Sequence, residues 1–256
     1  MERKPLVLAN WKMAMGISET ISFIERFIPL VGKLAEEVDI IICPPYTSLY
    51  VAACKLKGSP LQLGAQNLHP GPGLAFTGEI SASLLADVGC RWVMLGHWER
   101  RRYFGETDEL VNRKVRAALD AGLHPVLLVG ESREARESPY DDLARQLECI
   151  LSGCNAQEIK QMAFVYEPEW AIGVEKPASG VHIQKGCAYI REWLNRRFGG
   201  VGNSIRIIYG GSVSPESAPN ILTQPDVDGL GTTRKGRDPF SLFSIVKAVA
   251  EARVLT

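Results

Sequence analysis

The sequence predicts an α/β protein whose parallel strands close into a single (β/α)8 barrel over residues 1–256. Short apolar, β-prone runs recur at a spacing of roughly 20–40 residues, and segments with helical apolar spacing lie between them. The chain length of 256 residues suits one such barrel. An open doubly wound sheet is the structural alternative, but no G-x-G-x-x-G motif follows the first strand candidate.

The strand candidates are short apolar runs that end at turn residues or at polar side chains. Pro168 closes the sixth run, because proline lacks the backbone N–H that a strand ladder needs. In chain order we predict strands at Leu6–Ala9, Ile40–Cys43, Leu61–Gly64, Trp92–Leu95, Pro125–Val129, Ala163–Tyr166, Ile205–Tyr209 and Gly229–Gly231.

The helix candidates carry apolar residues three and four positions apart. Before the last of them, Asp238 and Pro239 match a helix N-cap followed by proline at the first helical position. In chain order we predict helices at Ile17–Leu34, Tyr46–Lys55, Ala82–Val88, Leu110–Ala121, Tyr140–Cys154, Gly180–Phe198, Ser214–Leu222 and Pro239–Ala252.

Composition and charge exclude several classes of protein. Lys and Arg together number 29, as do Asp and Glu, so the net charge of zero gives no reason to expect nucleic-acid binding. The six cysteines lack the short spacings of a zinc or redox motif, so we expect reduced thiols and no metal. The chain starts without a signal-like segment and contains no apolar run of membrane-spanning length. We therefore expect a cytoplasmic protein that does not enter a membrane.

Residues suited to catalysis follow several of the predicted strands. Lys12 follows the first strand, His97 the fourth, Glu167 the sixth, and the pair Gly210-Gly211 the seventh. Each has an ordinary structural explanation when taken alone: a solvated lysine, an ion cluster, a carboxylate at a corner, a plain turn. In a barrel, however, all strands end at the same rim. A cation, an imidazole, a carboxylate and a glycine turn at one rim predict proton-transfer chemistry.

The segment after Glu167 predicts a hinged lid. It contains Gly173, Pro177 and Ala178, which are small or stiff residues. A lid above a general base would keep water out of the reaction.

Short motifs occur in one order along nearly the whole chain: Asn10-Trp11-Lys12, Gly64–Asn67, Phe76–Ser81, Gly96-His97, Glu99–Arg101, Phe104–Thr107, Tyr166–Pro168, Trp170–Gly173 and Tyr209–Val213. In this order they resemble the triosephosphate isomerase family. The resemblance implies a (β/α)8 TIM barrel. It also implies an aldose–ketose isomerase that interconverts dihydroxyacetone phosphate and glyceraldehyde 3-phosphate, a step of glycolysis and gluconeogenesis, with no metal or organic cofactor.

The resemblance also implies a role for each catalytic candidate. Glu167 would remove a proton from the carbon next to the substrate carbonyl and return it to the neighbouring carbon. His97, held neutral, would polarise the carbonyl, and Lys12 would stabilise the enediolate charge. Asn10 would position Lys12, and Glu99 would support the cluster.

Binding residues and a partner follow from the same resemblance. The N–H of Gly173, together with Ser212 and the Gly210-Gly211 turn, would bind the substrate phosphate. The segment Gln66–Glu79 would reach a second copy of the chain, so the resemblance implies a homodimer.

The chain departs from the family pattern at two places. Trp98 occupies a position where the family has serine, and an indole is larger and offers no acceptor. It must either fill active-site volume or turn away. Thr233 and Arg234 stand where the family has two glycines that hold the phosphate. Arg234 or Lys235 could replace this grip, because guanidinium and ammonium groups bind phosphate.

These departures leave three readings of the function open. The first is the family's own triose-phosphate reaction. The second is an isomerase of another small phosphorylated sugar, such as a tetrulose phosphate, with Trp98, Arg234 and Lys235 as specificity determinants. The third is a non-enzymatic phosphosugar-binding paralogue, although the complete catalytic set speaks against it.

Overall fold

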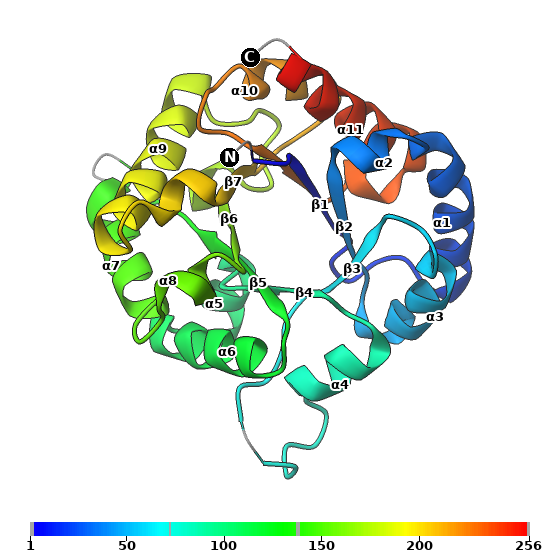
Figure 1. Ribbon diagram of the computed structural model, residues 1–256, viewed down its shortest axis with the longest axis horizontal. Helices are drawn as coiled ribbons and strands as arrows, with labels where there is room; N and C mark the ends of the chain where they lie inside the picture. Colours follow the sequence, from blue (N-terminus) through cyan, green and yellow to red (C-terminus); the bar gives the residue numbers. More distant parts are fainter. Residues whose placement is uncertain (1–2, 72, 137–138, 255–256) are drawn as a thin grey trace.

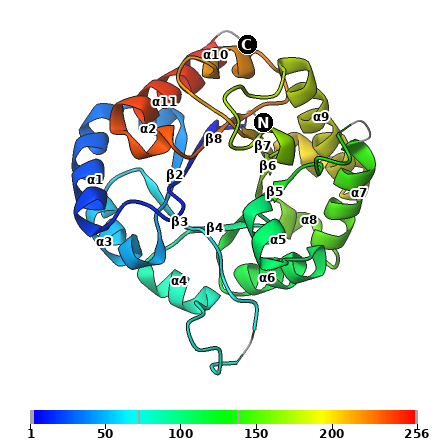
Figure 2. The ribbon, with the colours of Figure 1, turned by 180° about the vertical axis from the view of Figure 1, so that it is seen from behind.

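The computed structural model describes residues 3–71, 73–136 and 139–254. All neighbouring strands are parallel and pair in sequence order from β1 to β8, and β8 pairs with β1. The strands therefore form a closed barrel, and the helices surround it as an outer ring (Figure 1). The reverse view shows the same ring (Figure 2). The predicted (β/α)8 TIM barrel is confirmed.

Every predicted strand is present, and its ends differ from the prediction by at most one residue. The strands are β1 (Leu6–Asn10), β2 (Asp39–Cys43), β3 (Gln62–Ala65), β4 (Trp92–Leu95), β5 (His124–Val129), β6 (Ala163–Tyr166), β7 (Arg206–Gly210) and β8 (Gly229–Thr232).

The helices match the prediction less closely, because short ones were missed and some ends differ. They are α1 (Ile17–Val31), α2 (Leu34–Glu37), α3 (Tyr46–Leu56), α4 (Ala82–Val88), α5 (Trp98–Phe104), α6 (Asp108–Asp120), α7 (Pro139–Ile150), α8 (Ala156–Ile159), α9 (Gly180–Arg197), α10 (Ala218–Leu222) and α11 (Pro239–Val254). Three 3-10 turns complete the set: η1 (Glu169–Ala171), η2 (Val201–Ser204) and η3 (Lys235–Arg237).

Three predicted helices were too long by three or four residues, among them the fifth, which ends at Ile150 instead of Cys154. For the other two the structure shows the reason. The first ends at Val31, because Gly32 adopts a φ of 44° and turns the chain. The seventh begins at Ala218 instead of Ser214. There the hydroxyls of Ser214 and Ser217 accept each other's backbone N–H at 3.3 and 3.0 Å, which stabilises a turn in place of a helix.

No helix was predicted directly after β4, but the segment there forms α5. His97 is the N-cap of this helix, and its ring accepts a hydrogen bond from the backbone N–H of Glu99. Gly105, in the left-handed conformation, ends the helix after two turns. The helix start therefore fixes the orientation of the His97 ring through the bond to its Nδ1.

The side chains of the strands alternate between two packed layers. Leu6 and Leu8 of β1 lie inside the barrel, whereas Val7 and Ala9 pack outward against the helices. Apolar residues of the other strands fill the rest of the interior: Ile41, Cys43, Trp92, Met94, Val126, Leu128, Ala163, Val165 and Ile208. The interior is thus a packed core, which leaves the rim for binding and chemistry.

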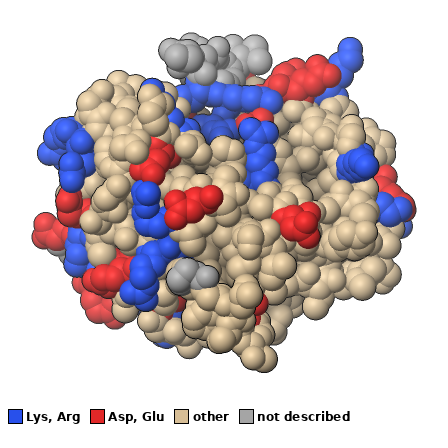
Figure 3. Space-filling model, turned by 60° about the horizontal axis from the view of Figure 1, so that its bottom comes forward, with Lys and Arg blue, Asp and Glu red and all other residues tan. Residues whose placement is uncertain are grey.

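The surface matches the balanced composition. On the face shown in Figure 3, basic and acidic side chains lie beside one another, and most of the surface carries neither. In the part of the chain that the structure describes, no helix combines the length and apolar character needed to span a bilayer.

Candidate active site

The structure brings the five predicted catalytic residues together at one rim. Asn10 ends β1 and Lys12 follows it, His97 and Glu99 follow β4, and Glu167 follows β6. The Nζ atom of Lys12 lies 2.6 Å from Oε1 of Glu99, and Nε2 of His97 lies 3.7 Å from Oε1 of Glu167. Residues up to 157 positions apart in sequence (10 to 167) therefore share one small volume.

Lys12 is held in an unusual backbone conformation, with a φ of 52°. Oδ1 of Asn10 accepts its backbone N–H at 2.9 Å, and Nε2 of Gln66 donates to its carbonyl at 2.8 Å. The preceding residue, Trp11, is fully buried and donates its indole N–H to the carbonyl of Gly236 at 2.8 Å. These contacts on both sides hold the strained residue and aim its ammonium group across the rim.

His97 is arranged to act as a neutral imidazole. Its Nδ1 accepts the backbone N–H of Glu99 at 3.1 Å, so the proton of the neutral ring is on Nε2, the atom that faces Glu167. Burial, together with smaller contributions from the cations of Lys12 and Arg100, lowers the pKa of His97 to about 3. The ring can therefore donate a hydrogen bond from Nε2 without carrying a charge.

Glu167 shows the opposite shift. Burial raises the pKa of its carboxyl to about 8, although Lys12 opposes this rise. Its Oε2 and the Nε2 of His97 are both buried, and neither has a hydrogen-bond partner among the described residues. A base with a pKa near neutrality and a neutral donor beside it are the two groups that proton transfer next to a carbonyl requires.

The lid, residues 168–178, lies against the rim. The hydroxyl of Ser212 donates to the carbonyl of Val174 at 2.5 Å, and the N–H of Ala178 donates to the hydroxyl of Tyr209 at 3.1 Å. Both contacts cross from the strand-7 side of the rim to the lid. The Ser212 hydroxyl, which was predicted to bind phosphate, is thus bonded to the lid, and its backbone N–H has no acceptor among the described residues.

Three predicted phosphate-binding glycines lie on this side of the rim. Gly173, at the lid tip, has a φ of 71°, and its N–H has no acceptor within the described residues. A Cβ atom at Gly210 would lie 2.5 Å from the side chain of Val165, and one at Gly211 would lie 2.4 Å from the Tyr209 hydroxyl. A side chain at either position would displace Val165 or Tyr209, which favours glycine at both.

The segment after β8 places three further candidates beside one another. Thr233 is half-buried, whereas Arg234 and Lys235 are exposed at the start of η3. The Arg234 guanidinium makes no hydrogen bond or ion pair with the residues that the structure describes. The backbone N–H groups of Thr233 and Arg234 are likewise unbonded there. These donors are free to bind an anion.

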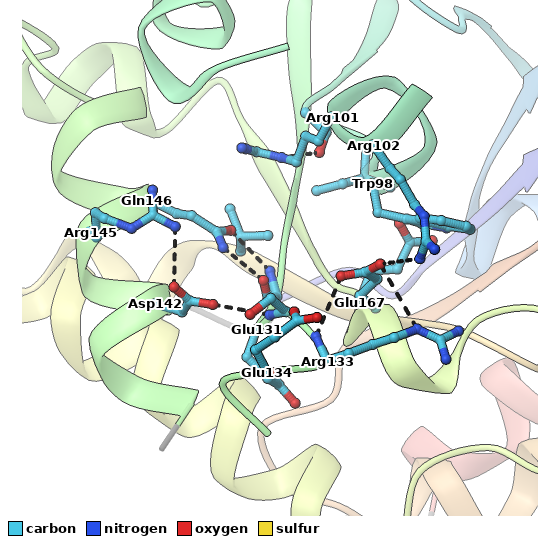
Figure 4. Close-up of a pocket in the computed structure, with 16 residues that line it drawn as sticks. Trp98, Arg101, Arg102, Glu131, Arg133, Glu134, Asp142, Arg145, Gln146 and Glu167 are labelled. Atoms are coloured by element: carbon cyan, nitrogen blue, oxygen red, sulfur yellow. Dashed lines mark hydrogen bonds and ion pairs between the residues drawn. The ribbon is translucent and has the colours of Figure 1, made fainter. Parts of the chain in front are cut away.

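Trp98 turns along α5 toward a cavity of about 470 Å³ between the ends of β4–β6 and helices α5 and α7. Glu167 lines the same cavity, and Figure 4 shows both side chains on one side of it. The indole lies 6.3 Å from the His97 ring and 5.7 Å from the Tyr103 ring, with the Arg102 guanidinium 6.0 Å above it. Trp98 and the predicted base Glu167 therefore line the same cavity.

Some residues of the site escaped the sequence analysis. Gln66 and Tyr209 stand inside the recognised motifs, but nothing in a motif shows which partner each one binds. Glu131 follows β5, so the strand-end rule that found the other carboxylates could have found it. Among the described residues, no group of three or more His, Cys, Asp or Glu side chains is arranged to hold a metal ion.

Comparisons with known proteins agree on one family. A family model described as triosephosphate isomerase matches residues 5–249. The chain is 42% identical to the triosephosphate isomerase of Symbiobacterium thermophilum over 254 residues, which covers 98% of this chain and 99% of that one. It is 42% identical to that of Carboxydothermus hydrogenoformans over 89% of this chain and 91% of that one. The protein of the same name from Dictyoglomus thermophilum is 40% identical, over 96% of this chain and all of that one.

The buried carboxylate should make stability depend on pH. The pKa of Glu167 in the folded state is raised from 4.5 to about 8. The free energy of unfolding therefore decreases as pH rises from 4.5 to 8, because the buried carboxyl resists ionisation. Glu167→Gln removes this decrease, and we expect the variant to be more stable than the parent above pH 8 and similar to it near pH 4.5. Urea unfolding at pH 4.5, 6.5 and 8.5 measures the difference. A difference that stays constant across these pH values would contradict the assigned burial.

Proposed function

The chain belongs to the triosephosphate isomerase family, and we propose that its rim residues carry out the family's reaction in the roles given below. The protein is an aldose–ketose isomerase that interconverts dihydroxyacetone phosphate and glyceraldehyde 3-phosphate. The observation that carries the assignment of roles is the buried pair of Glu167 and His97, 3.7 Å apart, with pKa values shifted in opposite directions. The relatives named above do not favour a tetrulose phosphate or a non-enzymatic paralogue.

The reaction is a proton transfer between neighbouring carbons. Glu167 removes the proton from the carbon next to the carbonyl, and the electron pair left on that carbon forms the carbon–carbon double bond of an enediolate. His97 donates from Nε2 to the carbonyl oxygen and moves a proton between the two oxygens. Glu167 then returns its proton to the neighbouring carbon. The charge that develops on oxygen is stabilised by Lys12.

Two residues position this machinery. Asn10 binds the backbone N–H of Lys12, and Glu99 pairs with its ammonium group at 2.6 Å. The lid excludes water from the enediolate, which would otherwise lose its phosphate or take protons from solvent. The reaction needs no cofactor, because each step uses a side chain of this set.

The phosphate site combines backbone and side-chain donors. The N–H groups of Gly173 and Ser212 and the turn at Gly210-Gly211 supply the backbone part. After β8, the N–H of Thr233 and the Arg234 guanidinium take the place of the glycine pair that is usual in the family. A guanidinium offers two parallel hydrogen bonds to phosphate, which offsets the loss of close backbone approach.

Trp98, Arg234 and Lys235 are the residues that set specificity in this proposal. Trp98 limits the volume beside the base, and the two cations set the strength of the phosphate grip. We further propose that residues 1–256 act as one domain in the cytoplasm, within glycolysis and gluconeogenesis.

A direct assay tests the function. Purified protein should convert glyceraldehyde 3-phosphate with a kcat/KM of about 10⁶–10⁸ M⁻¹s⁻¹. Glu167→Gln should lower kcat by about 10²–10⁴-fold, since it removes the general base while keeping the shape of the side chain. This variant, prepared identically, also controls for a contaminating host isomerase. Equal activity in both preparations would show that the activity is not this protein's or that Glu167 is not its base.

The proposed binding of the substrate phosphate by Arg234 can be tested separately. Arg234→Ala should raise KM for glyceraldehyde 3-phosphate by about tenfold or more, because a charge-assisted hydrogen bond to phosphate is lost. Arg234→Lys should recover part of the loss as a point charge. Lys247→Ala, which removes an exposed cation on α11, serves as the control. An unchanged KM in Arg234→Ala would remove Arg234 from the phosphate site.

A homodimer through Gln66–Glu79 belongs to the same proposal. The segment between β3 and α4 extends away from the barrel (Figures 1 and 2). It exposes Leu74 fully and Phe76 by 44%, and Met13 near the active site is 99% exposed. Apolar side chains in such positions suit a surface that a partner covers.

The interface can be disrupted at the tip of this segment. The double variant Leu74→Glu and Phe76→Glu should shift the protein from dimer to monomer, because a buried carboxylate at an interface is costly. Sedimentation velocity at matched concentration measures the change, with exposed Tyr50→Glu as a control outside the segment. A parent protein that sediments as a monomer would refute the dimer.

A further inference from the structure

A buried carboxylate that the reaction does not use anchors the start of the lid. Glu131 follows β5 and has no exposed surface. Its Oε1 accepts the indole N–H of Trp170, a lid residue, at 2.7 Å. Its Oε2 accepts the hydroxyl of Tyr166, the last residue of β6, at 2.9 Å. The carboxylate therefore ties the lid to the barrel next to the catalytic base.

His182 supplies a third donor to this carboxylate. It lies in the first turn of α9, with Nε2 2.8 Å from Oε1 of Glu131 and 2.8 Å from the Tyr166 hydroxyl. Because the Tyr166 hydroxyl donates to Glu131, Nε2 must carry a proton and donate to these oxygens. His182 thus shares the carboxylate oxygen that binds the lid indole.

The imidazole also touches the lid directly. The rings of His182 and Trp170 meet edge to face, with centroids 4.9 Å apart and planes at 80°. The His182 ring is nearly parallel to that of Tyr166, with centroids 6.1 Å apart. Contacts on two sides hold the ring in place between the lid and β6.

The three hydrogen bonds stabilise the charged form of the Glu131 carboxylate. Burial would raise the pKa of Glu131, but the hydrogen bonds from His182, Trp170 and Tyr166 hold it below its ordinary value. A buried carboxylate that loses one of three donors is left under-satisfied and must rotate, hydrate or take up a proton. Each of these changes weakens its bond to Trp170.

We propose that His182 is a positioning residue for the lid, which keeps Glu131 oriented toward Trp170 and braces the indole, so that the lid stays closed over the rim. His182 does not touch the substrate in this proposal. The inference rests on the proposed role of the lid in excluding water, and its test needs a readout that is independent of turnover.

Three variants separate this role from a general effect on folding. His182→Ala removes the donor and the ring. His182→Gln keeps an N–H donor at similar reach. Gln184→Ala is the matched control, because Gln184 lies in the same helix but bonds Asp226, away from the lid.

The first readout is cleavage of the ligand-free protein by a glutamyl endopeptidase within the lid, after Glu169 or Glu175. Cleavage requires the lid to open, so its rate reports the open population. We expect about tenfold faster cleavage in His182→Ala, which corresponds to about 1.4 kcal/mol. His182→Gln should restore most of the protection, and Gln184→Ala should match the parent.

The second readout is turnover of glyceraldehyde 3-phosphate. The kcat/KM of His182→Ala, measured well below the melting temperature of the variant, should fall by about tenfold, and His182→Gln should recover most of it. Unchanged cleavage in His182→Ala would overturn the inference, as would equal losses in His182→Ala and Gln184→Ala. If the parent protein shows no isomerase activity, the proposed function fails, while the cleavage rates still decide the role of His182.

Discussion

Closure of the barrel by the pairing of β8 with β1 is the constraint on which the rest of this structure depends. The register places Leu6 beside Gly229, where any Cβ atom would lie 1.8 Å from the Leu6 carbonyl. The seam therefore requires glycine at that position. Once it is closed, all eight strands end at a common rim. Lys12 then meets Glu99, and His97 meets Glu167, although no local feature of the sequence connects them.

The two central groups of the rim, His97 and Glu167, are buried. Burial acts in opposite directions on the two central groups: it raises the pKa of Glu167 to about 8 and lowers that of His97 to about 3. In both cases the neutral form gains, as expected where charge is poorly solvated. In the proposed reaction, the ammonium of Lys12 supplies positive charge that stabilises the enediolate. The buried carboxylate form of Glu167 is destabilised, and the same shift brings the pKa of the predicted base close to neutral pH.

The lid is bound to the barrel at both ends of its length. Near its start, Trp170 binds the buried Glu131, and at its end Ala178 binds the Tyr209 hydroxyl. In between, the carbonyl of Val174 accepts the Ser212 hydroxyl. These anchors come from strands β5 and β7 on either side of Glu167. The same packing that positions the base therefore also positions its cover.

The sequence by itself determined the barrel and predicted which polar residues lie together at its rim. Short apolar runs bounded by turns are local signals, so the strands were predicted to within one residue. Glu167 and His97 stood out because strand ends are also local features. Helix ends were less certain, since the turn at Gly32 and the paired hydroxyls of Ser214 and Ser217 compete with helical spacing.

Tertiary structure decided what depends on contacts between distant segments. Sequence could not show that Trp98 turns along α5 toward a cavity, because its direction follows from Tyr103 and Arg102 in a helix that was not predicted. Nor could it show that Glu131 joins Trp170 to His182, 51 residues from that carboxylate. Burial and pKa shifts likewise arise only when the barrel closes, because a side chain loses its water through neighbours that lie far away in the chain.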